Sequence, residues 1–263
     1  MSLAERMDAL AVRIQFPDPC SLFFIVERIR AMFDLGADWV DIARTLKSDP
    51  ALTERVRSAP GLRVPGCWDG FELATRAIVG QVISVASATA IAGRIAKKFG
   101  KPFIGAGKLT HLFPTPEVLA SADLSSVGLT KARAETIRTL ARAVCDGRIR
   151  FEGIVETDDF LARLCEISGI GTWTAQYVAM RALGEPDAFP AGDLGLLHTL
   201  NLTNSRELER RSEAWRPWRA YATMYLWNGF SQSKISENKP LVPETKRRLS
   251  KEPAPATSAS AIV

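Results

Sequence analysis

The segment "LCEISGIGTWTAQYVAMRALGEPDAFPAGDLGL", residues 164–196, breaks a helical pattern at two places. Apolar residues recur at helical spacing on both sides of Gly-Ile-Gly, which predicts two helices joined by a tight turn. Gly169 and Gly171 permit left-handed or closely approached backbone, and Thr172 stands where it can cap the second helix. A loop containing proline and glycine then brings Asp193 to the start of another apolar run.

This predicted hairpin suits an anion. The amides of Gly169 and Gly171 would lie at a helix N-terminus, where unpaired N–H groups and partial positive charge favour a negative ligand. Because no side chain takes part, a nucleic-acid phosphate can be held there whatever the base sequence. A helix-to-helix turn that simply requires its glycines is the alternative, and for this motif taken alone it is the commoner case.

Three side chains near the hairpin each have two interpretations. Trp173 and Tyr177 are four residues apart, hence on one face of the second helix, and such aromatic residues commonly pack into a core. Asp193 precedes the apolar run "LGLLHTL", where it can cap a helix. Their fixed order after the hairpin, rather than any one of them, indicates a site.

The composition is that of a globular protein. The chain of 263 residues is 46% hydrophobic and 24% charged, and its net charge of +5 permits a polyanionic partner without requiring one. Four cysteines without a CxxC pair, with only two histidines, argue against a zinc or iron–sulfur site and favour a reducing compartment. The uncharged stretch 77–93 is too short and too polar for a membrane span, and no signal peptide is evident, so we expect a soluble protein.

The pattern along the chain predicts an almost wholly helical fold. Only "AVRIQF", residues 11–16, alternates like a strand, and a lone strand needs a partner. From residue 231 the sequence becomes polar and is typical of a disordered tail. Asp49 and Thr130 stand where they can cap helices. The predicted helices cover residues 22–33, 39–48, 49–59, 69–99 as a pair, 116–122, 130–147, 157–184 as a pair, 194–202, 205–213 and 216–229.

From about Ser21 to Gly229 the chain resembles the helix-hairpin-helix superfamily of DNA glycosylases, and specifically the bacterial 3-methyladenine DNA glycosylase II family. Besides the hairpin segment, the resemblance includes "PGLRVPGCWDGFELATRAIVGQVISV", "FPTPEVLA", "LTKARAETI" and "WRPWRAYATMYLW". It implies a mainly α, two-lobed fold with a small N-terminal β remnant. We expect a remnant of a sheet domain at residues 1–20 and a lobe carrying Asp193 at residues 21–67 plus 186–230. A lobe ending in the hairpin is expected at residues 68–185, and a largely disordered tail at residues 231–263.

The resemblance also implies what individual residues do. Asp193 would be the catalytic carboxylate, stabilising an oxocarbenium-like sugar while the base departs. An alkylated purine is already cationic, so it leaves without a strong general acid and is attracted to aromatic faces. The base pocket is then expected at Trp173, Tyr177 and Trp227, and the wedge that enters the DNA at Gln81 and Val82. The phosphate-binding hairpin is expected at Gly169, Gly171 and Thr172. The backbone carbonyls for a Na⁺ or K⁺ ion are expected at Cys165, Ile167 and Ile170.

Some of these positions keep a second interpretation. Val82 is either the wedge or an ordinary core residue, and Ile83 is a candidate to share the task. Trp215, Trp218 and Tyr221 are expected to pack the last helix rather than to line the pocket.

The activity implied by the resemblance is that of a monofunctional glycosylase. Bifunctional relatives place a Schiff-base lysine in the hairpin, where this chain has Trp173. We therefore expect a hydrolase that flips and excises 3-methyladenine and related bases from double-stranded DNA, leaves an abasic site and needs no organic cofactor. We expect it to be a cytoplasmic, nucleoid-associated bacterial monomer without a membrane partner.

Two other functions remain as alternatives. One is a non-catalytic helix-hairpin-helix DNA-binding module, and the other is a glycosylase for a different damaged base. Asp193 and the pocket aromatics weigh against the first, and the missing lysine and iron–sulfur cysteines weigh against the second.

Overall fold

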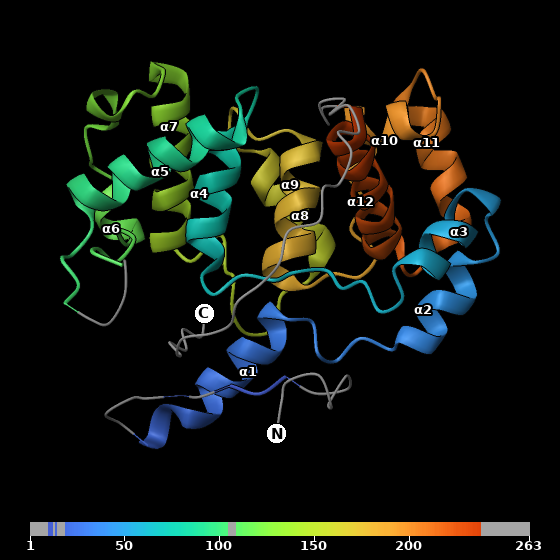
Figure 1. Cartoon of the computed structure of the whole chain (residues 1–263). Helices are drawn as coiled ribbons and strands as arrows, with labels where there is room; N and C mark the ends of the chain where they lie inside the picture. Colours follow the sequence, from blue (N-terminus) through green and yellow to red (C-terminus); the bar gives the residue numbers. More distant parts are fainter. Residues whose placement is uncertain (1–9, 13, 15–18, 105–108, 238–263) are drawn as a thin grey trace, which may run out of the picture.

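The computed structural model describes residues 10–12, 14, 19–104 and 109–237, and these are almost entirely helical, as predicted (Figure 1). The helices are α1 Leu22–Met32, α2 Trp39–Leu46, α3 Pro50–Ser58, α4 Gly70–Gly80, α5 Val85–Phe99, α6 Pro116–Leu119, α7 Lys131–Cys145, α8 Thr157–Cys165, α9 Thr172–Val178, α10 Leu194–Thr199, α11 Ser205–Ser212 and α12 Arg219–Glu237. A π-helical turn, η4 at Ala179–Leu183, continues α9, and a 3-10 turn, η5 at Glu213–Trp215, follows α11. Within the described residues the β pairing is limited to an isolated bridge between Pro102 and His111.

Polar side chains set where most of these helices begin. As predicted, Asp49 accepts a hydrogen bond from the backbone N–H of Ala51 and so caps α3, and Thr130 accepts one from Arg133 and caps α7. Such bonds satisfy N–H groups of the first turn that have no partner inside the helix. The same role at α2, α4, α5 and α11 belongs to Asp38, Asp69, Ser84 and Asn204.

Two predictions at the ends of the chain are wrong where the structure describes them. Helix α12 continues to Glu237, past the predicted start of a tail at residue 231, and residues 238–263 lie outside the described part. The predicted strand 11–16 is not formed at Ala11, Val12 and Ile14, and the rest of it lies outside the described residues. Alternation of apolar residues makes a strand only where a second strand supplies hydrogen bonds. No described helix combines the length and apolar character needed to cross a lipid bilayer.

The helices form two groups that lie side by side (Figure 1). In one group, α4 contacts α5, α7 and α9, and α6 contacts α7. In the other, α12 contacts α3 and α10, and α2 contacts α3. The pair α8 and α9 lies on the side of the first group that faces the second, so the predicted hairpin is near the centre of the molecule (Figure 1). Helix α1 lies apart, and none of its residues is buried.

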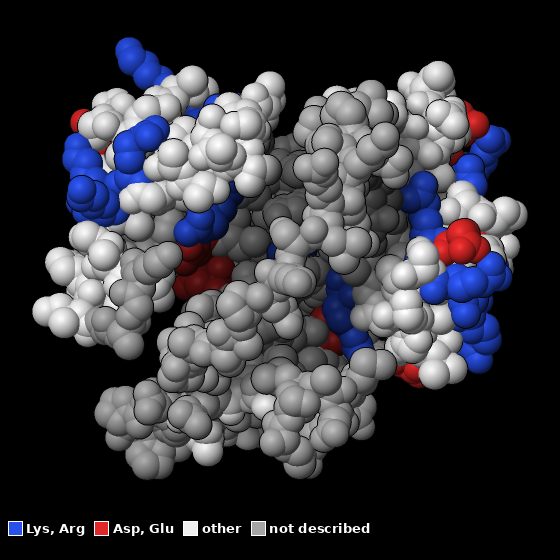
Figure 2. Space-filling view, viewed as in Figure 1, with Lys and Arg blue, Asp and Glu red and all other residues white. Residues whose placement is uncertain are grey.

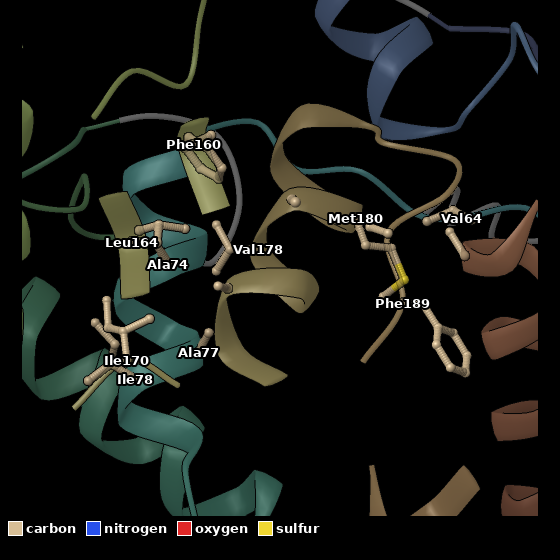
Figure 3. Close-up of a cluster of buried hydrophobic side chains, with 14 of the residues drawn as sticks. Val64, Ala74, Ala77, Ile78, Phe160, Leu164, Ile170, Val178, Met180 and Phe189 are labelled. Carbon is tan, nitrogen blue, oxygen red and sulfur yellow. The ribbon is translucent and has the colours of Figure 1, made fainter. Parts of the chain in front are cut away.

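An apolar core fixes the hairpin against its neighbours. Ala74, Ala77 and Ile78 of α4 cluster with Leu164 of α8 and Val178 of α9 (Figure 3), and all five side chains are buried. Burying a leucine- or valine-sized side chain contributes about 1.5–3 kcal/mol to the free energy of unfolding. The turn between α8 and α9 is therefore mounted on a well-packed support.

Asp49 joins helices of the other group. Its carboxylate accepts a hydrogen bond from Nε1 of Trp215 at 2.8 Å and forms an ion pair with Arg211 at 3.1 Å, in addition to capping α3. Burial raises the pKa of the Asp49 carboxyl, but hydrogen bonds from Arg211, the amide of Ala51 and Trp215 outweigh that effect and leave the pKa below its usual range. This joint holds together the group of helices from which α10 and Asp193 project.

Replacing Asp49 by Asn should lower the free energy of unfolding by about 2–3 kcal/mol at neutral pH, because the new amide can still cap α3 but cannot satisfy two N–H donors. The pKa of Asp49 is lower in the folded than in the unfolded protein, so the full difference in stability between parent and variant should be present above about pH 4, near the pKa of an unfolded aspartate. It should shrink as the pH falls through the lower folded-state pKa. Urea denaturation of both proteins between about pH 3 and pH 7 measures this difference.

The matched control is Glu54→Gln, which removes an exposed ion pair between Glu54 and Arg57 on α3. Exposed pairs of this kind contribute at most about 1 kcal/mol. A loss for Asp49→Asn no larger than that of the control would contradict the structural role of Asp49.

Candidate active site

The turn between α8 and α9 requires one of its glycines and leaves the other open. Gly169 has a φ of +93°, and a Cβ at this position would lie 2.3 Å from Oγ1 of Thr136. Gly171 occupies the cap position of α9, and no atom lies within 4 Å of where its Cβ would be. The prediction that Thr172 caps α9 is wrong, because Thr172 is the first helical residue and no side chain caps this helix. The first N–H groups of α9 therefore remain available to a ligand from outside.

Side chains from two other helices hold this turn. Thr136 on α7 donates a hydrogen bond to the carbonyl of Ser168 at 2.8 Å. Gln81, at the end of α4, donates from Nε2 to the carbonyl of Gly169 at 3.0 Å and to Oγ1 of Thr174 at 3.1 Å. The turn thus has a fixed shape before any ligand arrives.

Gln81 and Val82, predicted together as the wedge, do opposite things. Gln81 is an anchor, and its own carbonyl accepts a hydrogen bond from Arg133 on α7. Val82 has a φ of +59°, and its side chain is 97% exposed. Left-handed backbone is strained for a β-branched residue and persists only where the surroundings enforce it. The interpretation of Val82 as core is wrong, and Ile83 packs partly buried against the core instead of projecting beside it.

The carboxylate of Asp193 caps a helix, as one interpretation of the sequence predicted, and is also bound by two indoles. Its Oδ1 accepts the backbone N–H of Leu196 at 2.9 Å, so Asp193 caps α10. The same oxygen accepts the indole N–H of Trp227 at 3.0 Å, and Oδ2 accepts that of Trp173 at 2.8 Å. Capping uses part of one oxygen only, and two indoles bind the carboxylate from either side.

The three predicted pocket aromatics come together around this carboxylate. The rings of Trp173 and Tyr177 are stacked, with centroids 5.4 Å apart and planes 6° from parallel. The Trp227 ring lies 6.4 Å from that of Tyr177 at an angle of 49°. The prediction that Trp215 and Tyr221 serve packing is confirmed by their burial, and Trp218 packs against the same core.

A cavity of about 360 Å³ opens beside the stacked rings. Trp173 and Tyr177 line it together with Gly80, Ile83 and Val85, which come from residues 81–84 (the predicted wedge loop) and the helix ends on either side. A cavity of this size and mainly apolar lining is typical of a small-molecule site.

On the face shown in Figure 2, basic side chains gather at both lateral edges of the molecule, over the α5–α7 side and over the α2–α3 side.

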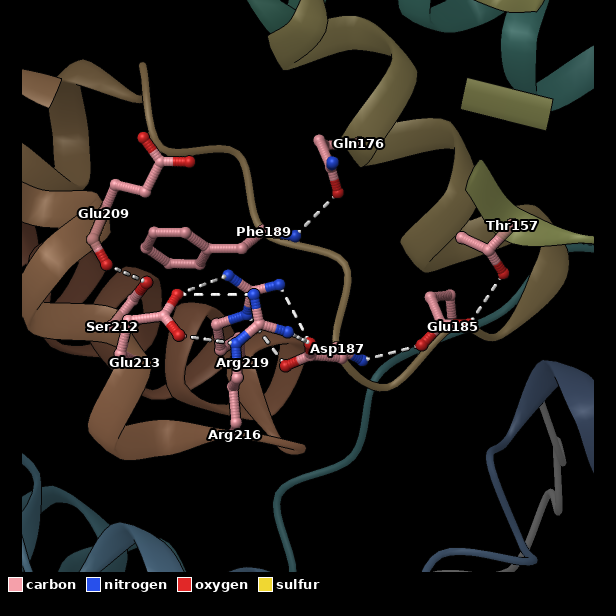
Figure 4. Close-up of polar contacts among 10 residues, drawn as sticks. All are labelled: Thr157, Gln176, Glu185, Asp187, Phe189, Glu209, Ser212, Glu213, Arg216 and Arg219. Atoms are coloured by element: carbon pink, nitrogen blue, oxygen red, sulfur yellow. Dashed lines mark hydrogen bonds and ion pairs between the residues drawn. The ribbon is translucent and has the colours of Figure 1, made fainter. Parts of the chain in front are cut away.

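The loop that carries Asp193 is tied to both groups of helices (Figure 4). Oε1 of Gln176 on α9 accepts the backbone N–H of Phe189 at 2.9 Å. Asp187 forms a two-pronged pair with Arg219 on α12, at 2.8 and 2.9 Å, and also binds Arg216. Four residues after Phe189 comes Asp193, so these contacts fix the position of the carboxylate relative to both indoles.

Sequence reasoning missed these supporting residues. The chain places Asp187 and Arg219 far apart, and neither stands in a motif, so only the folded structure shows that they meet. Gln176 lies on α9, three residues after Trp173 and directly before Tyr177. This closeness in sequence to the two aromatic residues is the local signal that could have identified it.

Comparison of the chain with known proteins shows the family to which it belongs. A family model described as "HhH-GPD superfamily base excision DNA repair protein" matches residues 75–219, which contain the wedge loop, the hairpin and Asp193. The chain belongs to this family. A second model, of the "AlkA N-terminal domain", matches residues 1–69 and therefore precedes the HhH-GPD region.

Two relatives and one solved structure illustrate the likeness. The "Probable bifunctional transcriptional activator/DNA repair enzyme AlkA" of Mycobacterium tuberculosis is 38% identical over 232 residues, which are 86% of this chain and 47% of that protein. This chain thus spans about half the length of the mycobacterial relative. The "DNA-3-methyladenine glycosylase" of Bacillus subtilis is 34% identical over 215 residues, 77% of this chain and 71% of that protein.

The HhH-GPD fold is also apparent from structure alone. The structure described as a 3-methyladenine DNA-glycosylase from Archaeoglobus fulgidus superimposes with a TM-score of 0.69 at 22% sequence identity, covering 84% of this chain and 78% of that one. At this level of identity the likeness establishes a shared fold.

Val82→Gly should leave the free energy of unfolding unchanged or raise it by about 1 kcal/mol. Glycine adopts positive φ without strain, and the relief of strain offsets the entropy that glycine gains in the unfolded chain. The Val82 side chain is 97% exposed, so its removal sacrifices almost no burial. Chemical denaturation of the two proteins measures the difference.

Val85→Gly serves as the control, since Val85 is also an exposed valine but lies in the first turn of α5 with helical backbone. There the change should cost about 0.5–1 kcal/mol. If Val82→Gly proves as destabilising as Val85→Gly, then the backbone at residue 82 is not strained.

Proposed function

We propose that this HhH-GPD protein is a monofunctional DNA glycosylase that flips alkylated bases, 3-methyladenine among them, out of double-stranded DNA and hydrolyses their N-glycosidic bonds. The observation that carries the proposal is the carboxylate of Asp193, held by the indole N–H groups of Trp173 and Trp227 next to an open hairpin. The relative from Bacillus subtilis that is named a DNA-3-methyladenine glycosylase supports the choice of substrate.

The proposed reaction breaks the bond between C1′ of the sugar and the base nitrogen. The electron pair of that bond goes to the base, so a cationic alkylated base leaves neutral, and positive charge develops on the sugar as an oxocarbenium ion. The carboxylate of Asp193 stabilises that charge electrostatically. Water then adds its oxygen to C1′ and loses one proton to the carboxylate or to solvent, which leaves an abasic site.

The aromatic side chains account for the choice of base. Ring faces attract a cation more strongly than a neutral molecule of the same shape. Trp173 and Trp227 bind the carboxylate, and the ring of Tyr177 contacts both of theirs. Trp173 also occupies the hairpin position at which a bifunctional enzyme would need an amine. An indole cannot form a Schiff base with the sugar, so the reaction ends at the abasic site.

The backbone of the DNA would be held at the hairpin and its stack would be opened at residue 82. The uncapped start of α9 offers N–H groups to a phosphate without regard to sequence. Val82 projects from the neighbouring loop, and Gln81 links that loop to the hairpin, so one bound duplex can meet both. An exposed apolar side chain of this kind can fill the gap left by a flipped nucleotide. We propose that the protein does this as a monomer, on nucleoid DNA.

A monovalent cation, Na⁺ or K⁺, is a further part of the proposal. The resemblance to the family implies the backbone carbonyls of Cys165, Ile167 and Ile170 as its ligands, and side-chain donors bind the neighbouring carbonyls of Ser168 and Gly169. The Ile167 carbonyl already accepts the N–H of Ile170 at 2.9 Å, but a carbonyl oxygen has a second lone pair. Bound there, the cation would add to the positive potential that attracts phosphate.

Asp193→Asn should reduce the single-turnover rate of base release by about a hundredfold or more, the usual effect of losing a preorganised electrostatic contact. Asparagine keeps an oxygen for Leu196 and Trp227, but its amide nitrogen faces the N–H of Trp173, so stability should fall by only about 1–2 kcal/mol. The measurement is incubation of each protein with methylated DNA and chromatographic identification of the released bases.

Duplex affinity and melting temperature of the variant are the controls, and DNA binding should survive or tighten, because a negative charge near phosphate has gone. Base release at the parent rate by a folded, DNA-binding variant would show that Asp193 is only a helix cap. Binding of DNA by the parent without any base release would favour the non-catalytic module.

The cation can be tested through DNA affinity. Duplex binding should be stronger in KCl or NaCl than in tetramethylammonium chloride at equal ionic strength, because the bulky organic cation screens charge equally but cannot enter a ring of carbonyls. Fluorescence anisotropy of a labelled duplex measures all three. Equal affinities in the three salts would rule out the proposed cation site.

A further inference from the structure

Three side chains form a continuous line along α9 and the π-helical turn that follows it. Trp173, Tyr177 and Arg181 are spaced four residues apart. Trp173 stacks on Tyr177 from one turn before it, and the guanidinium carbon of Arg181 lies 5.6 Å from the centroid of the same ring from one turn after. The guanidinium also donates to the hydroxyl of Tyr177 at 3.2 Å and, through Nε, to the carbonyl of Pro65.

Opposite charges stand at the two ends of this line. The carboxylate of Asp193 is hydrogen-bonded to Trp173 at one end, and the guanidinium of Arg181 covers Tyr177 at the other. Within the described residues Arg181 forms no ion pair, and it contacts the Pro65 carbonyl and the Tyr177 side chain instead. By contrast, Arg219 is paired with Asp187. Among the described residues Arg181 is therefore held in place without a carboxylate at ion-pair distance, and it is only partly exposed.

We propose that Arg181 and Asp193 act as a pair of opposite charges at the two ends of the Trp173–Tyr177 pair and so polarise the glycosidic bond toward the departing base. The inference rests on the proposed function, with the base beside Tyr177 and the sugar beside Asp193. As the bond breaks, positive charge moves from a cationic base to the sugar. That movement is away from Arg181 and toward Asp193, so both charges lower the barrier.

Two effects of opposite sign follow for a cationic base. Arg181 repels the cationic base in the bound ground state, which weakens binding, and the repulsion is relieved in the transition state, which speeds bond cleavage. A neutral base behaves differently, because it is not repelled in the ground state but gains negative charge as it leaves. For a neutral base Arg181 should therefore raise the rate with little effect on binding.

Single-turnover excision separates these effects. Duplexes that contain one 7-methylguanine, which is cationic, or one hypoxanthine, which is neutral, are incubated with increasing enzyme, and the maximal rate and the half-saturating concentration are obtained for each. Arg181→Gln should lower the maximal rate roughly tenfold on both, a smaller effect than that of a group in direct contact. It should lower the half-saturating concentration for 7-methylguanine by roughly threefold and leave that for hypoxanthine unchanged.

Arg28→Gln is a matched control. The Arg28 guanidinium lies 4.8 Å from the ring centroid of Phe24, four residues before it, and donates to the carbonyl of Trp68 at 2.6 Å, as Arg181 does with its own ring and carbonyl. Arg28 is paired with Glu152, however, and belongs to α1 rather than to the aromatic line. Both kinetic constants of Arg28→Gln should equal those of the parent.

Arg181→Lys distinguishes charge from shape, because lysine keeps the positive charge and a donor for Pro65 but not the planar guanidinium. It should retain the maximal rate within about threefold of the parent, and it keeps the test decisive if the glutamine variant is unstable. A lysine variant as slow as the glutamine variant would overturn the proposal in favour of planar packing. A folded Arg181→Gln protein with parent constants on both duplexes would overturn it as well. If the parent itself releases neither base, the proposed function fails, and the role of Arg181 fails with it.

Discussion

The carboxylate of Asp193 is bound by two indoles that reach it from different groups of helices. Trp173 belongs to α9 and Trp227 to α12, and their N–H groups lie 2.8 and 3.0 Å from the carboxylate oxygens. Bonds this short leave little freedom in how α9 and α12 lie relative to each other. The loop between them meets that requirement, since Gln176 holds it to α9 and Asp187 holds it to α12. The cores on either side serve to keep this geometry.

Helix α7 supports both the wedge loop and the hairpin. One turn apart on this helix, Arg133 binds the carbonyl of Gln81 and Thr136 binds the carbonyl of Ser168. Gln81 then connects the wedge loop to the hairpin directly. Val82 directly follows the anchored Gln81, so its strained backbone is attached to a rigid helix. An exposed side chain keeps a defined position only when the backbone that carries it is rigid.

The sequence predicted well what local chemistry decides. The helices, the caps at Asp49 and Thr130, and the left-handed turn at Gly169 follow from signals within a few residues. It predicted less well what depends on distant partners. Nothing local marks Val82 for left-handed backbone, because the contact from α7 that supports this loop falls on the carbonyl of the preceding residue, Gln81. Thr172 was misplaced by one residue since a glycine can occupy a cap position without a side-chain bond.

The site residues were predicted from their order, and their bonding was not. The order of hairpin, Trp173, Tyr177 and Asp193 is written in the sequence, whereas the acceptance of both indole N–H groups by one carboxylate depends on α12, which follows later in the chain. The spacing of four that joins Trp173 to Tyr177 continues to Arg181, but the sequence alone does not show that its guanidinium lies over the Tyr177 ring.

The contacts of α3 with η5 and α12 have a consequence for the order in which the protein folds during synthesis. Asp49 and Trp215 are 166 positions apart in the chain, and the hydroxyl of Tyr225 binds the carbonyl of Ala59 over the same separation. Helices α2 and α3 leave the ribosome early, yet they have no completed core until α12 has been synthesised. The group from α4 to α9 is continuous in sequence and can close first. On a growing chain the hairpin would thus be formed before the carboxylate that it faces has a folded lobe to project from.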